Sequence, residues 1–299
     1  MPKISDIIYY SKYYDAKVFF KLAYWKFKNM LFGVKFPMGI SIDVTNKCNL
    51  RCKHCYFFKQ NHTKELSETK LLEKLKEIKK ENPSIIHASW VGGEPLLRKR
   101  ILEEGTKLFL INMIVTNGTL ELPKLKNCNF YVSVDGTKKY YEKIRGENIY
   151  EKVKKNADRD NIPVFIKCVL NKQNYGCAEE MLKEWKKTKV RGITFDFYTP
   201  IKGIKEALWL NQKERDKVLD KLLELKKIYG DFISNSEKVL KAMKSENSGK
   251  ITKNCLLPKA TISLDPMGKR KLPCVIGEKA DCSRCGCVVP FYLKELLRV

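Results

Sequence analysis

The pattern that most constrains the fold is an alternation of short strand-like segments with longer helical ones between residues 38 and 229. The short segments are rich in β-branched and aromatic residues, and the longer ones repeat apolar residues at helical spacing. We expect six strands, over residues 38–45, 85–91, 108–115, 129–134, 162–170 and 192–198. We expect helices over residues 66–80, 96–105, 149–158, 177–187 and 211–229. Ser67 or Thr63 is the expected N-cap of the first of these helices. This alternation predicts a parallel sheet of the α/β class, with too few units for the eight of a closed TIM barrel.

Three cysteines follow the first predicted strand. Cys48, Cys52 and Cys55 have the spacing C-x3-C-x2-C. Three thiolates on one tight loop can hold three irons of a cubic [4Fe–4S] cluster and leave the fourth iron open for a small molecule. A disulfide framework is disfavoured, because no signal-peptide pattern precedes the cysteines and the chain is long enough to bury its own core. Zinc usually takes four ligands, and this loop supplies three.

Three further motifs each follow a predicted strand. They are Gly92-Gly93-Glu94-Pro95, Thr116-Asn117-Gly118 and Ser133-Val134-Asp135-Gly136. Together with the cysteines, and with His54 just before the last of them, these motifs resemble the radical S-adenosylmethionine superfamily. The resemblance implies an open, partial barrel of six strand–helix units, with the chemistry at the carboxyl ends of the strands.

The resemblance also implies roles for these residues. Cys48, Cys52 and Cys55 would bind the cluster, and S-adenosylmethionine would chelate the open iron and be cleaved to a 5′-deoxyadenosyl radical that takes a hydrogen atom from a substrate. The candidate residues for binding S-adenosylmethionine are His54 near the adenine, Gly92, Gly93 and Glu94 at the methionine amino group, and Asn117, Ser133 and Asp135 at the ribose or carboxylate. The residues themselves leave plainer roles open, since Gly and Pro suit a strand-to-helix turn, and Ser and Asp before Gly136 suit a turn. Arg145 would bridge to a carboxylate or form a surface ion pair.

A second group of cysteines lies near the C-terminus. Residues 261–274 read as a strand, a Pro-Met-Gly turn, a second strand and a Cys. This segment resembles the hairpin of SPASM or twitch modules, which carry auxiliary [4Fe–4S] clusters. Four of the five cysteines would hold a second cluster or a zinc ion, and which four is left open: Cys255, Cys274, Cys282, Cys285 and Cys287. We assign no chemistry to Cys128, Cys168 and Cys177, because buried cysteines usually act as small hydrophobes.

The N-terminal segment and the charge bear on partners. Residues 4–32 repeat apolar and aromatic residues at helical spacing, with lysines between them, which predicts a basic amphipathic helix that lies on an anionic membrane or packs on the next domain. The net charge is +25, which would attract polyanions or reflect a lysine-rich solvated surface. No apolar run approaches the ~20 residues that span a bilayer. We find no RNP motif or helix-turn-helix, which disfavours nucleic acid as a partner.

These observations predict three parts: an N-terminal helix (1–37), a partial barrel (38–232) and a C-terminal metal-binding module (233–299). The expected function is a cytoplasmic radical S-adenosylmethionine enzyme, with peripheral membrane contact left open. Its expected partners are a low-potential electron donor, such as a ferredoxin or flavodoxin, and a peptide, lipid or small-molecule substrate. The alternatives are a non-catalytic zinc-binding adaptor and a radical enzyme that modifies nucleic acid.

Overall fold

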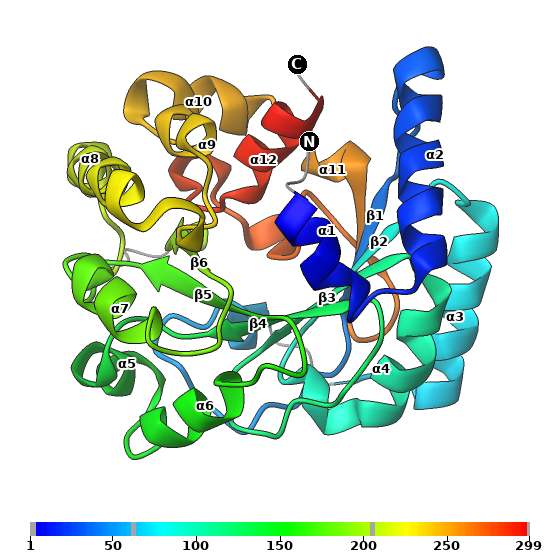
Figure 1. The fold of residues 1–299 in the computed structure, drawn as a ribbon, viewed down its shortest axis with the longest axis horizontal. Helices are drawn as coiled ribbons and strands as arrows, with labels where there is room; N and C mark the ends of the chain where they lie inside the picture. The colour runs from blue at the N-terminus through cyan, green and yellow to red at the C-terminus, as the bar shows by residue number, and fades with distance from the viewer. Residues whose placement is uncertain (1–3, 61–63, 204–206, 298–299) are drawn as a thin grey trace.

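The fold is built on one curved sheet, seen in a computed structural model that describes residues 4–60, 64–203 and 207–297 (Figure 1). The strand order is β6-β5-β4-β3-β2-β1-β7-β8; β8 is antiparallel to β7 and the other pairs are parallel. The strands are β1 (Gly39–Asp43), β2 (His87–Val91), β3 (Ile111–Thr116), β4 (Cys128–Ser133), β5 (Val164–Leu170), β6 (Ile193–Phe197), β7 (Thr261–Leu264) and β8 (Arg270–Lys271). The predicted α/β class and all six predicted strands are confirmed, and the C-terminal hairpin adds two more.

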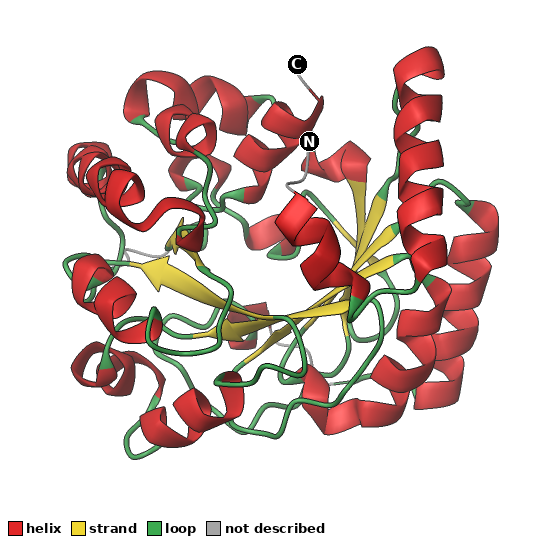
Figure 2. Ribbon diagram, in the orientation of Figure 1, coloured by secondary structure: helices red, strands yellow, loops and turns green. Residues whose placement is uncertain are grey.

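Helices surround the curved sheet (Figure 2). They are α1 (Ile4–Ser11), α2 (Ala16–Phe32), α3 (Glu68–Glu81), α4 (Lys99–Gly105), α5 (Lys138–Arg145), α6 (Tyr150–Ala157), α7 (Ala178–Trp185), α8 (Gln212–Tyr229), α9 (Glu237–Ala242), α10 (Ser245–Lys253), α11 (Leu257–Ala260) and α12 (Val289–Leu297). Short 3₁₀ helices are η1 (Phe58–Gln60), η2 (Pro95–Arg98), η3 (Thr106–Leu108), η4 (Gly230–Phe232), η5 (Gly277–Lys279) and η6 (Cys282–Arg284). All five predicted helices between residues 66 and 229 are confirmed; α5 was not predicted. Ser67 caps α3, and Thr63 lies outside the described residues.

Along the strands, residues that pack on the outer helices alternate with residues on the inner face of the sheet. This inner face surrounds what we call the lumen of the partial barrel. In β1, Ile40 and Ile42 join the same core cluster as Leu71 and Leu75 of α3. In β3, β4 and β5 buried residues likewise alternate with partly exposed ones. Because successive strand residues point to opposite faces, the partly exposed residues line the lumen.

The C-terminal segment spans the opening between the two edges of the sheet. β7 pairs in parallel with β1, while further along the chain Gly286 accepts a hydrogen bond from the backbone N–H of Phe197 in β6 at 2.9 Å. The backbone N–H of Val288 donates to the Asp196 carboxylate of β6 at 2.9 Å. A Cβ on Gly286 would lie 2.2 Å from the Phe197 carbonyl oxygen, so only glycine permits this approach. The predicted boundaries at residues 37/38 and 232/233 stay a prediction.

The N-terminal segment forms two helices where one was predicted. α1 packs at the amino ends of the strands, where Tyr13 accepts a hydrogen bond from the backbone N–H of Asn127 at 3.0 Å and Arg191 lies 3.8 Å from the centre of the Tyr9 ring. The backbone N–H of Asp15 donates to the Asn127 side chain at 2.8 Å. These contacts hold residues 12–15 against the barrel, and α2 begins at Ala16 as a separate helix. Within the described ranges, no helix is both long and apolar enough to cross a bilayer.

Candidate active site

The predicted site motifs meet at one end of the sheet, because they follow β1, β2, β3 and β4 and these strands run in parallel. The Cys loop, residues 46–55, follows β1 and carries Cys48, Cys52 and Cys55. Ser133 is the last residue of β4 and is partly exposed on the lumen side. Its predicted contact with a ligand stays a prediction.

The glycines after β2 hold the stem of the Cys loop. The backbone N–H of Gly93 donates to the Thr45 carbonyl at 2.9 Å, and that of Glu94 donates to the Lys47 carbonyl at 2.8 Å. A Cβ on Gly93 would lie 2.0 Å from the Lys47 carbonyl oxygen. Gly92 has a φ of +113°, and a Cβ there would lie 2.9 Å from the backbone nitrogen of Val44. The glycines therefore permit close contact with the chain itself, and their predicted contact with S-adenosylmethionine stays a prediction.

The Glu94 carboxylate ties the end of β2 to the end of β3. It is fully buried and accepts hydrogen bonds from the backbone N–H of Leu96 at 3.0 Å, the Thr116 hydroxyl at 2.7 Å and the backbone N–H of Asn117 at 2.8 Å. Burial raises the pKa of Glu94, and these hydrogen bonds oppose the rise. Oε2 receives only the bond from Asn117 among the described residues, so it keeps capacity for a ligand ammonium.

Asn117 connects the end of β3 to the Cys loop. Its side-chain amide donates to the Asn49 side chain at 2.9 Å and to Cys48 Sγ at 3.7 Å. Asn49 in turn donates to the Thr119 hydroxyl at 2.7 Å. Asn117 thus lies beside Cys48 with its amide engaged by the protein, and its predicted contact with S-adenosylmethionine stays a prediction.

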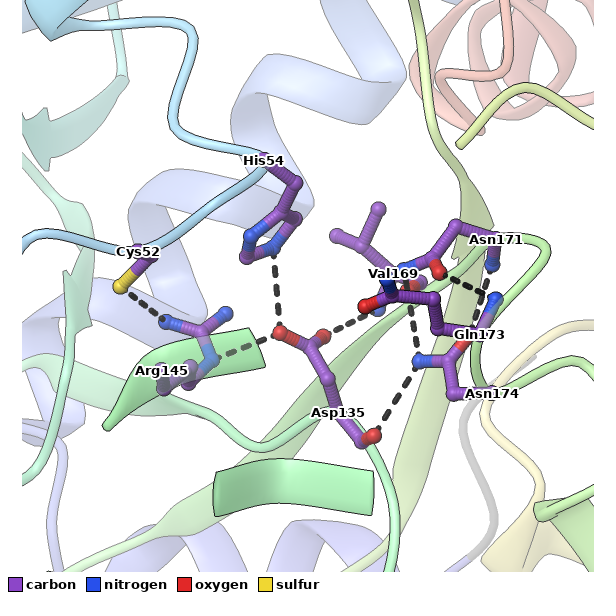
Figure 3. Close-up of polar contacts among 8 residues, drawn as sticks. All are labelled: Cys52, His54, Asp135, Arg145, Val169, Asn171, Gln173 and Asn174. Carbon is purple, nitrogen blue, oxygen red and sulfur yellow. Dashed lines mark hydrogen bonds and ion pairs between the residues drawn. The ribbon is translucent and has the colours of Figure 1, made fainter. Parts of the chain in front are cut away.

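Asp135 is the centre of a buried network after β4 (Figure 3). Its carboxylate accepts from Arg145 Nε at 2.7 Å and from the backbone N–H of Val169 at 2.8 Å, and lies 3.1 Å from His54 Nε2. Arg145 reaches on to Cys52 Sγ at 3.9 Å. The bridge from Arg145 to a carboxylate is confirmed, and because both side chains are buried the surface ion pair is wrong.

This network fixes charge beside the Cys loop. Burial disfavours the charged form of Asp135, but the charges of Arg145 and His54 outweigh it and hold the pKa of Asp135 well below its usual range. Burial alone would lower the pKa of Arg145, and the charges of Asp135 and Cys52 raise it instead. His54 was predicted near adenine and is held by Asp135 through Nε2. Its buried Nδ1 has no hydrogen-bond partner among the described residues, and its predicted place near the adenine stays a prediction.

The three thiols of the Cys loop differ in their surroundings. Burial raises the pKa of Cys52 to about 11, with Arg145 opposing, and burial also raises the pKa of Cys48. Across the described ranges, no three His, Cys, Asp or Glu side chains are placed to hold a single metal ion. A cubic cluster has a different requirement. Each thiolate binds a different iron, so the sulfurs need not converge on one point.

The C-terminal cysteines separate into four and one. Burial raises the pKa of Cys274, and the nearby thiols of Cys282 and Cys255 add to the rise. Burial raises the pKa of Cys285 to about 11, with Cys274, Cys255 and Cys282 adding to it. Cys287 instead lies next to Asp196 and Lys167, as well as Cys285, and its pKa is raised chiefly by burial. Cys285 is thus influenced by the other three thiols, and Cys287 by Cys285 alone among them; which four of the five bind metal stays a prediction.

Several polar residues of the lumen were missed from the sequence. Lys167 of β5 pairs with Asp196 of β6 at 2.7 Å, and Lys271 of β8 pairs with Asp43 of β1. For Asp43, Lys167 and Asp196 the signal was a charged residue inside an otherwise uncharged strand, whereas Lys271 stands beside Arg270 in β8 and gave no such signal. Tyr56, directly after Cys55, has a pKa raised first by burial and then by the charges of Asp43, Cys55, Cys274 and Cys287. It therefore lies between the two cysteine groups.

Known proteins match part of this chain. Residues 42–184 match the family described as the Radical SAM superfamily. These residues form a radical SAM domain. Over 173 residues, 51% of this chain, the sequence is 33% identical to a 7,8-dihydro-6-hydroxymethylpterin dimethyltransferase of Methanocaldococcus jannaschii, of which the match covers 30%. Over 224 residues, 66% of this chain, it is 26% identical to an uncharacterised protein of that organism, of which it covers 74%. The chain thus spans less than a third of the dimethyltransferase.

Solved structures show the same fold at low identity. Native anSMEcpe with bound AdoMet has a TM-score of 0.62 and 18% identity, over 81% of this chain and 75% of that chain. Streptococcus suis SuiB bound to precursor peptide SuiA has a TM-score of 0.62 and 16% identity, over 90% of this chain and 68% of that chain.

The radical SAM domain presents groups that fit the cofactors of its family, a [4Fe–4S] cluster and S-adenosylmethionine. Cys48, Cys52 and Cys55 are soft ligands that suit iron. The unpartnered His54 Nδ1 and the spare capacity of Glu94 Oε2 lie on the motifs around them. These residues therefore fit both the [4Fe–4S] cluster and S-adenosylmethionine.

The Asp135–Arg145 pair should behave as one unit. Replacing Arg145→Met leaves a buried carboxylate short of its main partner, so we expect the free energy of unfolding to fall by about 3–5 kcal/mol. Asp135→Asn combined with Arg145→Met should cost less than the sum of the two single changes, because no unpaired charge remains. Urea unfolding of anaerobically purified protein measures both, with Lys143→Met on the exposed side of α5 as the control. Additive losses would mean that the two residues act separately.

Proposed function

We propose that this chain is a radical SAM enzyme that takes a hydrogen atom from a polypeptide substrate. The observation that supports this proposal is that three thiols lie on one loop at the mouth of the partial barrel. Contacts with Glu94, Asn117 and Arg145 hold this loop and its surroundings in place. When bound, the cluster and S-adenosylmethionine supply the electron and the 5′-deoxyadenosyl radical. The chain supplies their placement over the lumen and limits access of water.

Two buried carboxylates would orient the ligand from opposite sides. Glu94 offers Oε2 to an ammonium, while Arg145 and His54 both engage Oδ2 of Asp135 and the backbone N–H of Val169 donates to its Oδ1. Asp135 therefore acts by positioning His54, whose Nδ1 is left to contact the ligand. Charge-assisted hydrogen bonds of this kind contribute about 1.5–3 kcal/mol each.

The chemistry of the lumen supports a polypeptide over a hydrocarbon chain. Two ion pairs, Lys167–Asp196 and Asp43–Lys271, face it. Ser41 Oγ, Asp43 Oδ1 and Asn129 Oδ1 are buried without a hydrogen-bond partner among the described residues. These groups and the two ion pairs make the lumen polar, which suits a peptide backbone better than a hydrocarbon chain. Two neighbours in fold, SuiB and anSMEcpe, have been solved with peptides bound.

Isotope transfer tests the reaction and the substrate class together. Cells that express the protein are grown in D₂O, and their polypeptide, lipid and small-molecule fractions are separated. Each fraction is incubated anaerobically with the enzyme, S-adenosylmethionine and dithionite. We expect deuterium in 5′-deoxyadenosine only with the polypeptide fraction, measured by mass spectrometry. Transfer from the lipid or small-molecule fraction, the latter containing pterins, would overturn the substrate class.

Two single-cysteine variants control this experiment. Cys52→Ala should abolish formation of 5′-deoxyadenosine, because one iron ligand is lost. Cys128→Ala removes a buried thiol at the opposite end of β4 and should leave it intact. Activity in Cys52→Ala would contradict the enzyme assignment, and a protein that holds zinc and no iron would support the adaptor.

A basic pocket beside the Cys loop suits an acidic electron donor. The pocket has a volume of about 540 Å³ and lies next to the buried Arg145. Its lining includes five cationic side chains and two carboxylates, namely Arg51, Lys53, Lys139, Lys143, Arg145, Glu142 and Glu147. Opposite charge steers association over a distance, and flavodoxins and ferredoxins would meet this surface within reach of Cys52.

The pocket predicts that donor docking depends on charge. Lys143→Glu should slow turnover several-fold when a flavodoxin supplies electrons at low salt, and leave turnover with dithionite unchanged. Lys227→Glu, an equal charge change on exposed α8, is the control. The rate of 5′-deoxyadenosine formation measures both. Equal slowing by the two variants would place the donor elsewhere.

We further propose that Cys255, Cys274, Cys282 and Cys285 hold a second [4Fe–4S] cluster. A buried cation supports an anionic centre there. Arg215 of α8 donates to the carbonyls of Cys285 at 2.7 Å, Arg284 at 3.0 Å and Tyr198 at 3.2 Å. Within the described ranges, no carboxylate forms an ion pair with it. A cluster with four thiolates would supply the missing negative charge.

The grouping of four cysteines predicts an iron count. Cys255→Ala with Cys274→Ala should lower iron by about four atoms per chain and loosen residues 251–299 to protease, because the metal staples segments far apart in the chain. Cys287→Ala should keep the full iron content. Unchanged iron with loss of zinc in the double variant would make the centre a zinc site, and loss of iron in Cys287→Ala would contradict the grouping.

A further inference from the structure

The α2 helix has apolar residues on two opposite faces. Val18, Leu22, Trp25 and Asn29 recur every three or four residues and form the inward, buried or half-buried face. Phe20, Tyr24, Phe27 and Leu31 recur with the same period and form what we call the outward face. These four side chains are 74%, 65%, 55% and 56% exposed. Packing on the barrel therefore accounts for the inward face and leaves the outward face unexplained.

The exposed apolar surface continues past the end of the helix. Met30 and Phe32 are exposed, as is Phe36 after Gly33 ends the helix. Single exposed apolar side chains are ordinary, but a contiguous group of large ones marks an interaction surface. Figure 1 shows α2 at the rim of the molecule, with one end standing clear of the neighbouring helices.

The charges on α2 are all positive. Its 17 residues include four lysines and no Asp or Glu. Lys17, Lys21 and Lys28 are exposed and repeat with helical spacing along one flank of the outward face. Lys28 Nζ lies 5.9 Å from the centre of the Tyr24 ring, so its charge is held beside the aromatic row. Burial, and after it the charge of Lys21, lowers the pKa of Lys79 in α3, which shows that like charges gather at this edge.

We propose that α2 binds the surface of an anionic lipid bilayer through its outward face. An aromatic and aliphatic stripe flanked by lysines suits a bilayer interface, where the apolar side chains enter the acyl boundary and the lysines meet phosphate groups. A helix of about 25 Å length, at 1.5 Å per residue, lies along such a surface. The net charge of +25 opposes a second copy as the occupant, since two α2 helices would bring like charges together. RNA would use the lysines and leave the aliphatic residues exposed.

Cosedimentation of the full-length, anaerobically purified protein with vesicles tests the proposal. We expect at least ten-fold tighter binding to equal parts phosphatidylglycerol and phosphatidylcholine than to phosphatidylcholine alone. Phe20→Ser with Phe27→Ser should weaken binding to the anionic vesicles at least ten-fold. Ile228→Ser with Tyr175→Ser, two exposed apolar residues elsewhere, should leave it unchanged. All four side chains are exposed, so circular dichroism should show each variant folded.

The charge on α2 has its own matched control. Lys17→Gln, Lys21→Gln and Lys28→Gln together should weaken binding to anionic vesicles, whereas the same change at the exposed Lys227, Lys238 and Lys250 should weaken it much less. Cys52→Ala should bind like the wild type, so this result is independent of the proposed enzyme activity.

Four outcomes would overturn the proposal. The first is equal binding to neutral and anionic vesicles, and the second is binding that the Phe20/Phe27 variant retains. The third is a dimer, seen by sedimentation, that dissociates in that variant. The fourth is tight RNA binding that is lost with the three lysines and kept without the two phenylalanines.

Discussion

The buried Asp135 carboxylate is the interaction on which the arrangement of the site depends. It joins Arg145 at the end of α5, His54 in the Cys loop and the backbone of Val169 in β5. Glu94 does the same on the other side, where it joins the ends of β2 and β3. Each carboxylate is shielded from water, so the loss of a partner is costly. The Cys loop is therefore held from two sides, by Asp135 at His54 and by the hydrogen bonds of Asn117 to Cys48 and Asn49.

The C-terminal segment spans the opening between the two edges of the partial barrel. β7 extends the sheet beyond β1, and residues 286–288 hydrogen bond along β6. Arg215 connects this crossing to α8 through carbonyl groups alone. The second cysteine group lies in that crossing, so a metal bound there would stabilise the same segment that covers the gap. We therefore expect closure of the barrel to be coupled to assembly of the proposed second centre.

The sequence predicted those structural features that depend on residues close together in the chain. The strands, the order of the motifs and the C-terminal hairpin follow from spacing and turn residues. The short helix α5 was missed because its Tyr141 and Ile144 make only one helical repeat. The pairing of β7 with β1 joins residues 222 positions apart, and the Asp43–Lys271 ion pair joins residues 228 positions apart. No local pattern in these segments indicates which partner each one has. The proposed division of the five C-terminal cysteines into four and one likewise rests on which thiols influence one another in the folded chain.

The charge of the chain lies outside its core. Among the described residues, four buried carboxylates, Asp43, Glu94, Asp135 and Asp196, are matched by four buried cations, Arg98, Arg145, Arg215 and Lys271. The excess of +25 therefore belongs to the surface. The basic pocket and α2 share this charge, but only α2 adds an apolar stripe. Salt screens charge within about 10 Å at 0.1 M and leaves apolar burial largely intact. Donor docking should thus vanish at salt concentrations that membrane binding partly survives.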